Sequence, residues 1–413
     1  MKRSKAILFL VALAFGLSSE AWETPRGQLT VRGVSAYPSQ YSIYDYTDES
    51  PMYDFGVDLR LMWETQLNDR LSLNFAYETN SRYGNLEELY TALDGFNFPT
   101  KQSSNQGSLM DLSHMVSSGR DYFVLHQVDR INLKYQASAF CVTLGRDAIS
   151  WGNGLVFNPL DFLNPFAPSN VERDYKEGTD LLSIDIYDIG REISASLVFV
   201  PRKNSNKDVS VESSTFAVKL QKQFDEKELQ LIGAIHYNEP LLGIGWNGTV
   251  GDALYRFDLN TTFLEEGSTA FSAVANIDYS WIAWDKNMYG FIELYYNDLG
   301  AIDISLYDIN PNLLERLSRG EVFALGRYEA ALGLDVEIHP LVHLYYSGMV
   351  NISDGSMTHL PRVVYNVTEQ MDLSLGATLY SGNTGSEYGG LKITDFLNTK
   401  APDSIYLWLK YYF

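Results

Sequence analysis

Histidine is the first side chain to consider for catalysis or metal binding, and this chain has six. They are His114, His126, His236, His339, His343 and His359. None belongs to a local motif of a catalytic triad or a metal site. No metal cluster, phosphate-binding loop or basic patch accompanies them. We therefore expect no enzyme activity and no cofactor, although a triad assembled in space around His236 or His343 stays open.

The connection between residues 147 and 178 carries the other candidate chemistry. It is rich in Phe, Trp, Asn and Pro, whereas other long connections are rich in Ser and acidic residues. Aromatic faces stack on sugar rings and amides satisfy sugar hydroxyls, so this loop could bind a carbohydrate. Alternatively, its aromatic side chains pack against a wall and only shape a constriction. The candidate contact residues are Trp151, Asn153, Phe157, Asn158, Asp161, Phe162, Asn164, Phe166 and Arg173.

Two Asn-Pro pairs stiffen this loop at Asn158 and Asn164, because a residue before proline favours extended backbone. An apolar loop of this kind is costly to expose to water, so we expect it to fold inward. Arg173 and Asp174 can then pair with interior charges or with each other.

Short runs of alternating apolar and polar residues must position this loop, and they repeat along the whole chain. Residues 55–63 and 71–77, for example, alternate around a short turn at 68–70. A period of two is that of a β-strand with one apolar face. We count about eighteen such segments, or sixteen if the weakly patterned regions 242–262 and 361–380 are read differently. The GxGxxG pattern at 243–248 lies within one of these strands, since no helix follows it.

The alternation continues to the end of the chain. Ile405, Leu407, Leu409 and Tyr411 alternate with polar or interfacial residues before Phe413. An open edge strand invites pairing with other chains, whereas a closed barrel has no edge. We therefore predict an all-β, single-chain, antiparallel transmembrane barrel whose last strand pairs with the segment around Leu29, Val31 and Gly33.

A soluble all-β repeat protein, such as a propeller, is the alternative fold. The chain has no fixed sequence period. Its charged residues also occupy alternate positions of the strands, and therefore one face of the sheet, so the barrel is favoured. Long connections at 38–53, 80–121, 147–178, 201–213, 298–321 and 381–403 fall at one end of an even-stranded barrel, with the tight turns at the other. Short helices are expected after Asn85 and after Asn310, ending at Gly95 and Gly320.

The amino terminus and the overall charge indicate the compartment. Residues 1–21 have the basic start, apolar core and small-residue cleavage site of a signal peptide, leaving 22–413 as the barrel; an uncleaved anchor is the alternative. The net charge of −21 argues against nucleic acid as a partner. A single cysteine excludes an internal disulfide. These features predict the bacterial outer membrane, with its lipid and lipopolysaccharide as partners.

Alternate residues of a strand point to the same face, so the positions between the apolar residues also predict the pore lining. The interior positions are Asp58, Arg60, Glu64, Lys134, Asp185, Lys219, Arg256, Asp258, Asp278, Glu329, Asp335 and Glu337, together with Glu78, Arg130 and Lys410. This mildly acidic set disfavours strong anion selectivity. Opposed acids and bases could create a field across the lumen, or form salt bridges that keep the wall rigid.

The pattern GRD, WGNG, NP, D, NPF, R and G-D between residues 145 and 180 resembles outer-membrane porins of the carbohydrate-porin and alginate-export kind. The resemblance implies a single-chain barrel of up to eighteen strands with an inward-folded loop. It also implies that the strand ending at Phe413 is recognised by the barrel-assembly machinery. An alginate exporter would have a strongly basic lumen, and this chain departs from that.

Two functions follow from these expectations. The first is a porin that lets small polar solutes, such as sugars, diffuse through a constricted pore. The second is a structural or adhesin-like barrel that binds partners through its outer loops. The tyrosines and acids of the first loop suit adhesion or divalent-ion bridging to lipopolysaccharide: Tyr37, Tyr41, Tyr44, Asp45, Tyr46, Asp48, Glu49 and Tyr53.

Overall fold

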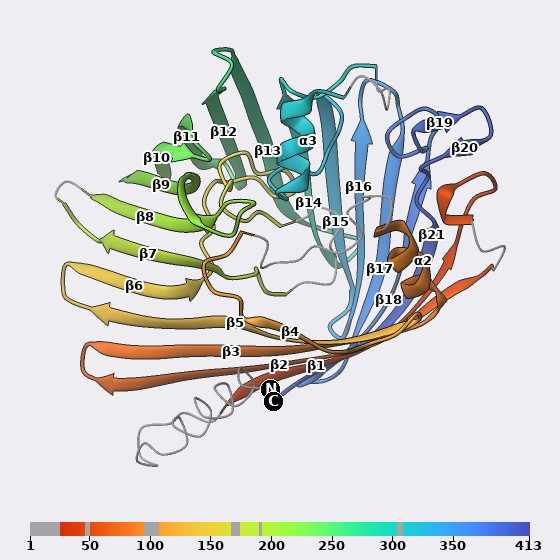
Figure 1. The fold of residues 1–413 in the computed structure, drawn as a ribbon, viewed down its shortest axis with the longest axis horizontal. Helices are drawn as coiled ribbons and strands as arrows, with labels where there is room; N and C mark the ends of the chain where they lie inside the picture. The colour runs from red at the N-terminus through yellow and green to blue at the C-terminus, as the bar shows by residue number, and fades with distance from the viewer. Residues whose placement is uncertain (1–24, 46–49, 95–106, 167–173, 190–191, 304–308) are drawn as a thin grey trace.

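The computed structural model describes residues 25–45, 50–94, 107–166, 174–189, 192–303 and 309–413, which form one closed antiparallel barrel (Figure 1). The predicted count of about eighteen strands is confirmed over these residues, and the alternative of sixteen is wrong. The wall strands are β1 Arg26–Tyr37, β2 Met52–Asn68, β3 Leu71–Tyr83, β5 Tyr122–Gln136, β6 Phe140–Asp147, β7 Thr179–Ile186, β8 Ile193–Lys203, β9 Val209–Phe224, β10 Lys227–His236, β11 Glu239–Val250, β12 Ala253–Phe263, β13 Thr269–Ala283, β14 Lys286–Asn297, β15 Tyr328–His339, β16 Val342–Asn351, β17 Met357–Thr368, β18 Met371–Ser381 and β21 Asp403–Tyr412. The proposed signal peptide, 1–21, lies outside the described residues.

The first and last strands close the barrel. In the β1–β21 register, Leu29 lies opposite Tyr411, Val31 opposite Leu409 and Gly33 opposite Leu407, which confirms the predicted pairing. The start of β1 and the end of β21 lie together at one end of the barrel, where Gly27 and Phe413 exchange backbone hydrogen bonds (Figure 1). Closure gives each of these wall strands two hydrogen-bonded neighbours within the described part of the chain.

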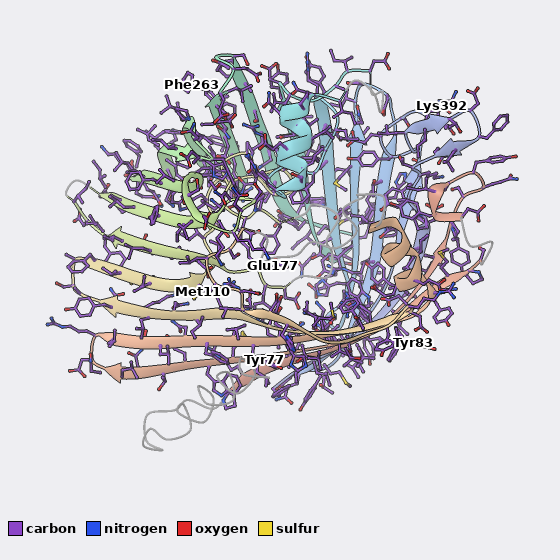
Figure 2. All side chains as sticks on the ribbon, viewed as in Figure 1. Tyr77, Tyr83, Met110, Glu177, Phe263 and Lys392 are labelled. Carbon is purple, nitrogen blue, oxygen red and sulfur yellow. The ribbon has the colours of Figure 1, made fainter. Side chains whose placement is uncertain are left out.

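Strand alternation separates an apolar outer face from a mixed inner face. Leu242 is 56% exposed and its neighbour Leu241 is 3% exposed. Likewise, Leu407 is 50% exposed and Trp408 is 1% exposed. Figure 2 shows side chains standing on both faces of the strands. Aliphatic and aromatic side chains cover the outside, which is the surface that a lipid bilayer solvates.

The connections between strands differ in length at the two ends of the barrel. Two-residue turns such as 251–252 and 284–285 lie at the end that holds the termini, as predicted. One tight turn, Tyr237–Asn238, lies at the opposite end among the long connections, so that part of the prediction is wrong. Both turn residues have positive φ values, 48° and 65°, as a type I′ hairpin requires.

The long connections carry short elements of their own. The predicted helices are α2, Asn85–Asp94, and α3, Pro311–Ser318, where the Asn310 side chain accepts the Asn312 N–H. A 3-10 turn, η1 Ile43–Asp45, an extra strand β4, Ser113–Ser118, and a small hairpin of β19 Lys392–Thr394 and β20 Leu397–Asn398 complete the loops. Neither α-helix among the described residues is long and apolar enough to span a membrane.

Candidate functional site: a loop folded into the barrel

The connection between β6 and β7, residues 148–178, folds into the barrel, as predicted. We call it the inner loop; its described parts are 148–166 and 174–178. Trp151, Leu160, Phe162 and Leu163 are buried against the inner wall. The wall side chains that meet them come from β7 to β11: Leu181, Val198, Val200, Ala217, Ile232, Ala234 and Leu241. An apolar cluster on the inner wall therefore anchors the loop.

Two glycines on β11 make room for this packing. A Cβ at Gly243 would lie 2.5 Å from Leu160 Cδ2, and one at Gly245 would lie 3.2 Å from Leu160 Cδ1. Both glycines face the interior, because the alternate residues Leu242 and Ile244 are exposed outside. The GxGxxG pattern is thus part of a strand, as expected, and its first two glycines form a hollow that receives the inner loop.

Two wall carboxylates bind the backbone of the inner loop. Glu293 on β14 accepts the backbone N–H groups of Leu155, Val156 and Phe157 at 2.7, 3.0 and 2.7 Å. Asp258 on β12 accepts the backbone and side-chain N–H groups of Asn153, both at 2.6 Å. Both acids are fully buried. A buried carboxylate needs such donors, so these contacts fix the loop in one position.

An ion pair joins the two described parts of the inner loop. We call residues 148–166, which follow β6, the descending arm, and residues 174–178, which lead into β7, the returning arm. Lys176 Nζ lies 2.6 Å from both carboxylate oxygens of Asp161, and it also donates to the Ile149 carbonyl. Burial raises the pKa of Asp161 to about 6, against the opposing effect of the Lys176 ammonium. Burial also lowers the pKa of Lys176. The pair holds the loop together at a cost in desolvation.

The returning arm reaches the opposite wall. Asp174 accepts hydrogen bonds from Gln28 on β1 at 2.8 Å and from Lys410 on β21 at 2.7 and 2.9 Å. The Arg60 guanidinium lies 4.4 Å from the centre of the Tyr175 ring. Since the descending arm packs on β7 to β14, the inner loop is attached to walls on both sides of the lumen.

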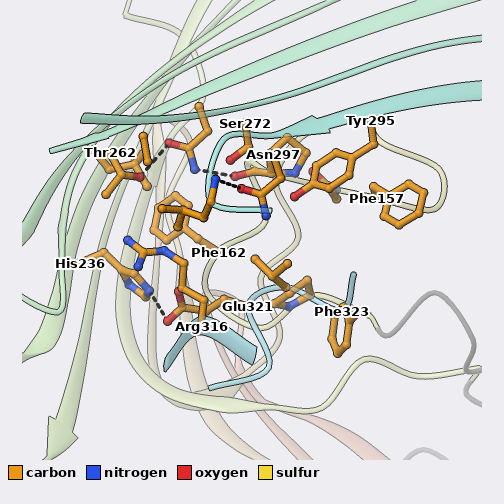
Figure 3. Close-up of a pocket in the computed structure, with 18 of the residues that line it drawn as sticks. Phe157, Phe162, His236, Thr262, Ser272, Tyr295, Asn297, Arg316, Glu321 and Phe323 are labelled. Atoms are coloured by element: carbon orange, nitrogen blue, oxygen red, sulfur yellow. Dashed lines mark hydrogen bonds and ion pairs between the residues drawn. The ribbon is translucent and has the colours of Figure 1, made fainter. Parts of the chain in front are cut away.

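A cavity of about 60 Å³ lies between the inner loop, the inner wall and the outer loop that follows α3 (Figure 3). The wall contributes ends of β10 to β14, and the outer loop contributes Glu321 to Phe323. Phe157 stacks on Tyr295 at 4.8 Å with an interplanar angle of 9°, and Phe162 meets His236 edge-on at 5.0 Å. The cavity therefore combines aromatic walls with polar wall residues.

The predicted contact residues of the loop divide into two groups. Phe157, Asn158, Phe162 and Phe166 line the cavity. Trp151 is packed in the apolar cluster, while Asn153, Asp161 and Asn164 make hydrogen bonds that hold the loop in shape. Arg173 lies outside the described residues. Of the eight described candidates, four line a cavity and four hold the loop in shape, so both alternatives that the sequence left open stay predictions.

The predicted pore-lining residues all lie on strands, on the face opposite the apolar exterior, and most have polar partners. The pairs are Asp58 with Arg82, Arg60 with Glu78 and Asp129, Lys134 with Asp147, Asp185 with Ser196, Arg256 with Asp278, Asp335 with His343, and Glu337 with Asn287. Lys219 lies over the Trp151 ring at 5.6 Å. These contacts favour a rigid, paired wall over an open field across the lumen.

Three interior acids depart from a simple lining role. Asp258 is covered by the inner loop, and Glu329 is fully buried where it accepts the Tyr388 hydroxyl at 3.1 Å. Glu293 was missed by the sequence analysis, although its position between the exposed Ile292 and Leu294 gives it interior parity. Glu64 lies on the inner face opposite Asn74 in the β2–β3 register.

The spatial triad that the sequence left open has a geometric counterpart around His236. Its Nδ1 lies 2.7 Å from Thr215 Oγ1, and its Nε2 lies 3.0 Å from Glu321 Oε1. Thr215 is fully buried and also accepts a hydrogen bond from Arg202 at 2.5 Å. Through these contacts the cluster joins the wall to the outer loop.

Solved structures of bacterial outer-membrane proteins share this fold. OccK5 (OpdH) of Pseudomonas aeruginosa is 8% identical, with a TM-score of 0.56 over 94% of this chain and 97% of that chain. OccAB2 of Acinetobacter baumannii is 9% identical, with a TM-score of 0.55 over 96% and 99%. OpdK of P. aeruginosa, solved with vanillate, is 10% identical, with a TM-score of 0.50 over 95% and 99%. No protein-family model and no curated protein matches the chain.

At these identities the likeness concerns the fold. The predicted porin-type barrel is confirmed at that level, whereas the narrower resemblance to carbohydrate porins and alginate exporters is not supported. The closed barrel and its apolar outer face place the chain in the bacterial outer membrane.

Proposed function

We propose that this protein is an outer-membrane porin that gives small polar solutes passive passage through a pore narrowed by the inner loop. The observation that carries the proposal is the attachment of that loop inside the barrel by Glu293 and Asp258. A loop fixed inside the barrel narrows the lumen, and a narrowed lumen is how a diffusion channel selects small solutes.

Two solute classes follow from the interior. Sugars are the first, because aromatic and amide side chains line the cavity beside the inner loop. Anionic solutes are the second. Arg362 on β17 faces the interior 4.8 Å from the Tyr345 ring, and among the described residues it has no hydrogen-bonded carboxylate. The structural neighbour OpdK was solved with vanillate, which agrees with the second class.

The partners and processing that the sequence predicts belong to the same proposal. Residues 1–21 direct export and are removed, and the strand ending at Phe413 is recognised by the assembly machinery. Lipid and lipopolysaccharide surround the apolar exterior. The adhesin-like alternative rests on the exposed Tyr37, Tyr41 and Tyr53 of the first loop. Tyr46, Asp48 and Glu49 lie outside the described residues, and Tyr44 packs near Met52.

Planar-bilayer recording separates the two functions. Pure, folded protein should give stepwise conductance, and deletion of 151–168 should increase it, because the inner loop no longer narrows the lumen. Phe396→Ser, on an outer hairpin where Phe396 is 77% exposed, serves as the control and should leave conductance unchanged. Absence of conductance from heat-modifiable, folded barrel would exclude the porin and favour the surface-binding alternative.

A further inference from the structure

Three connections meet where β15 begins, at the end of the barrel opposite the termini (Figure 1). They are the outer loop that follows α3, the turn between β16 and β17, and the connection 382–402 between β18 and β21, which we call the last outer loop. Glu387 of the last outer loop accepts the Leu325 and Gly326 N–H groups at 2.7 and 2.9 Å. It also accepts Asn351 Nδ2 at 2.9 Å. One carboxylate therefore joins the last outer loop to the loop that follows α3 and to the wall.

A second glutamate faces Glu387. Glu329 is fully buried on β15, and its Oε2 accepts the Tyr388 hydroxyl at 3.1 Å. The Glu329 and Glu387 side chains lie within hydrogen-bond reach of each other, yet Glu329 Oε1 has no donor among the described residues. Gly326 leaves the space for this contact, because a Cβ there would overlap Glu329 Oε1. Two carboxylate oxygens are both acceptors, so they can bond to each other only through a proton.

No cation neutralises this pair of glutamates. Within the described parts of the chain, neither carboxylate forms an ion pair with a lysine, arginine or histidine. The ionisable groups that face them are Asp354 in the turn between β16 and β17, Tyr388 in the last outer loop and Tyr295 on β14. Asp354 accepts the Glu387 N–H at 2.8 Å and adds a third carboxylate. Adjacent buried carboxylates retain a proton between them, because two charges together are both desolvated and repelled.

The hydrogen bonds assign the proton to one member of the pair. Burial raises the pKa of Glu387, but the N–H groups that it accepts favour its ionised form. Glu329 accepts one hydroxyl and has one oxygen without a donor. A proton on Glu329 Oε1 therefore donates to Glu387 and gives every oxygen of the pair a partner.

We propose that Glu329 and Glu387 share one proton, and that this bond is a latch that holds the last outer loop and the loop that follows α3 against the rim of the barrel. Loss of the proton leaves two adjacent negative charges in a buried site, and their repulsion releases the last outer loop. The Tyr388 ring, which packs against the apolar cluster that contains Phe157 of the inner loop, leaves with it. In the proposed porin the latch controls how the outer loops cover the mouth. That role rests on the porin function, whereas the shared proton does not.

The direction of the pH dependence follows from the state that binds the proton. The latched state holds a proton that the released carboxylates, with a pKa of roughly 4.3 in water, do not hold at neutral pH. Acid therefore stabilises the latched state, and this stabilisation is lost as the pH rises through the value at which the shared proton dissociates. Buried glutamates are known with pKa values of roughly 8–9. We expect the latch to hold at pH 7 and to be released at pH 9.5.

Infrared spectroscopy and limited proteolysis of the detergent-solubilised, folded barrel test the latch without requiring transport. A protonated carboxylic acid has a carbonyl band distinct from that of a carboxylate, and Glu329→Gln should remove one such band from the spectrum at pH 7. Trypsin should cut after Arg327 and Lys400 several-fold faster at pH 9.5 than at pH 7, relative to the cut after Lys207. Lys207 lies on the exposed turn between β8 and β9 and corrects for the pH dependence of trypsin itself.

Three variants separate the latch from other effects of pH. Glu329→Gln keeps a donor toward Glu387 at every pH, so the pH dependence of cleavage should disappear. Glu337→Gln, which changes a glutamate at the other end of β15 that binds Asn287, is the matched control and should retain it. Glu387→Gln removes the carboxylate that accepts three N–H groups, and it should give fast cleavage at both pH values. It serves as the test if Glu329→Gln does not fold.

The proposal is wrong if Glu329→Gln leaves the infrared spectrum unchanged, or if its cleavage depends on pH as in the original protein. Fast cleavage at pH 7 after addition of EDTA would assign the link to a divalent cation and would also overturn the latch. These results are independent of conductance. A failed latch with persistent conductance leaves the porin function standing, while a shared proton and pH-dependent cleavage without any conductance would overturn the porin function and keep the latch.

Discussion

The Asp174 carboxylate and the Lys410 ammonium join the inner loop to the strand that closes the barrel, with Nζ 2.7 and 2.9 Å from the two carboxylate oxygens. The same carboxylate accepts Gln28 Nε2 from the first strand. One side chain of the loop therefore bridges the two strands at the closure of the barrel. This arrangement couples the position of the loop to the integrity of the wall.

Removal of that contact should loosen the loop more than it weakens the barrel. Asp174 is partly exposed, so we expect Asp174→Asn to cost about 1 kcal/mol in loop attachment. The measurement is the frequency of high-conductance openings in single-channel records, which should rise several-fold. Asp395→Asn removes a carboxylate from the exposed pair with Lys392 and is the control. Equal opening frequencies in the two variants would contradict a role for Asp174.

Glu293 should be the more important anchor, because it accepts three backbone N–H groups in a fully buried position. Glu293→Gln places an amide N–H against these donors, and we expect a cost of roughly 3 kcal/mol. The loop should leave the wall, and mean conductance should increase. Glu337→Gln removes an interior carboxylate that binds Asn287 and has no hydrogen bond to the described parts of the inner loop, so it should keep the original conductance. An unchanged conductance in Glu293→Gln would show that the other anchors suffice.

The Asp161–Lys176 pair should make loop insertion depend on pH. Burial raises the pKa of Asp161 to about 6, whereas an aspartate in water has a pKa of roughly 4. Between these values the inserted loop binds a proton that a released loop does not, so acidification stabilises insertion. That stabilisation, roughly 3 kcal/mol at most, is lost as the pH rises through 6. Openings should therefore be rarer at pH 5 than at pH 7.

Substitution identifies the group responsible for this pH dependence. Asp161→Asn imitates the neutral acid and should give the same opening frequency at both pH values. Asp185→Asn, which changes a wall aspartate bound to Ser196, should retain the dependence of the original protein. A pH dependence that survives in Asp161→Asn would assign it to another group.

Arg362 should influence ion selectivity. It faces the interior beside Tyr345 and, within the described part of the chain, has no hydrogen-bonded carboxylate, so its charge is available to a passing anion. Arg362→Met should shift the reversal potential in a salt gradient toward cations, by about a two-fold change in permeability ratio. Lys392→Met removes a charge from an outer hairpin and should have a smaller effect. Identical shifts would show that Arg362 acts only through net charge.

The barrel could be predicted from sequence because its signal repeats in every strand. Alternation along the strand predicts that Leu407 and Trp408 point to opposite faces of the barrel wall, but it does not predict which residues they contact. The contacts of the inner loop were less predictable, because alternation along a strand does not show which segments meet in space. Asp258 has interior parity like Asp278, yet one binds the loop backbone and the other binds Arg256. Which carboxylate meets the loop depends on packing between segments more than 100 residues apart, and no local pattern records it.

The hollow at Gly243 provides a test of that long-range packing. Gly243→Val should displace Leu160, whose Cδ2 lies 2.5 Å from the position of a Cβ, and overpacking of this kind costs about 1–3 kcal/mol. The loop should detach and conductance should rise. Gly233→Val on β10, where a Cβ meets nothing within 4 Å, is the matched control and should be silent. Leu160→Ala combined with Gly243→Val should restore the closed conductance in part, because the smaller loop side chain makes room for the valine. A double variant that conducts like Gly243→Val alone would show that the hollow does not seat Leu160.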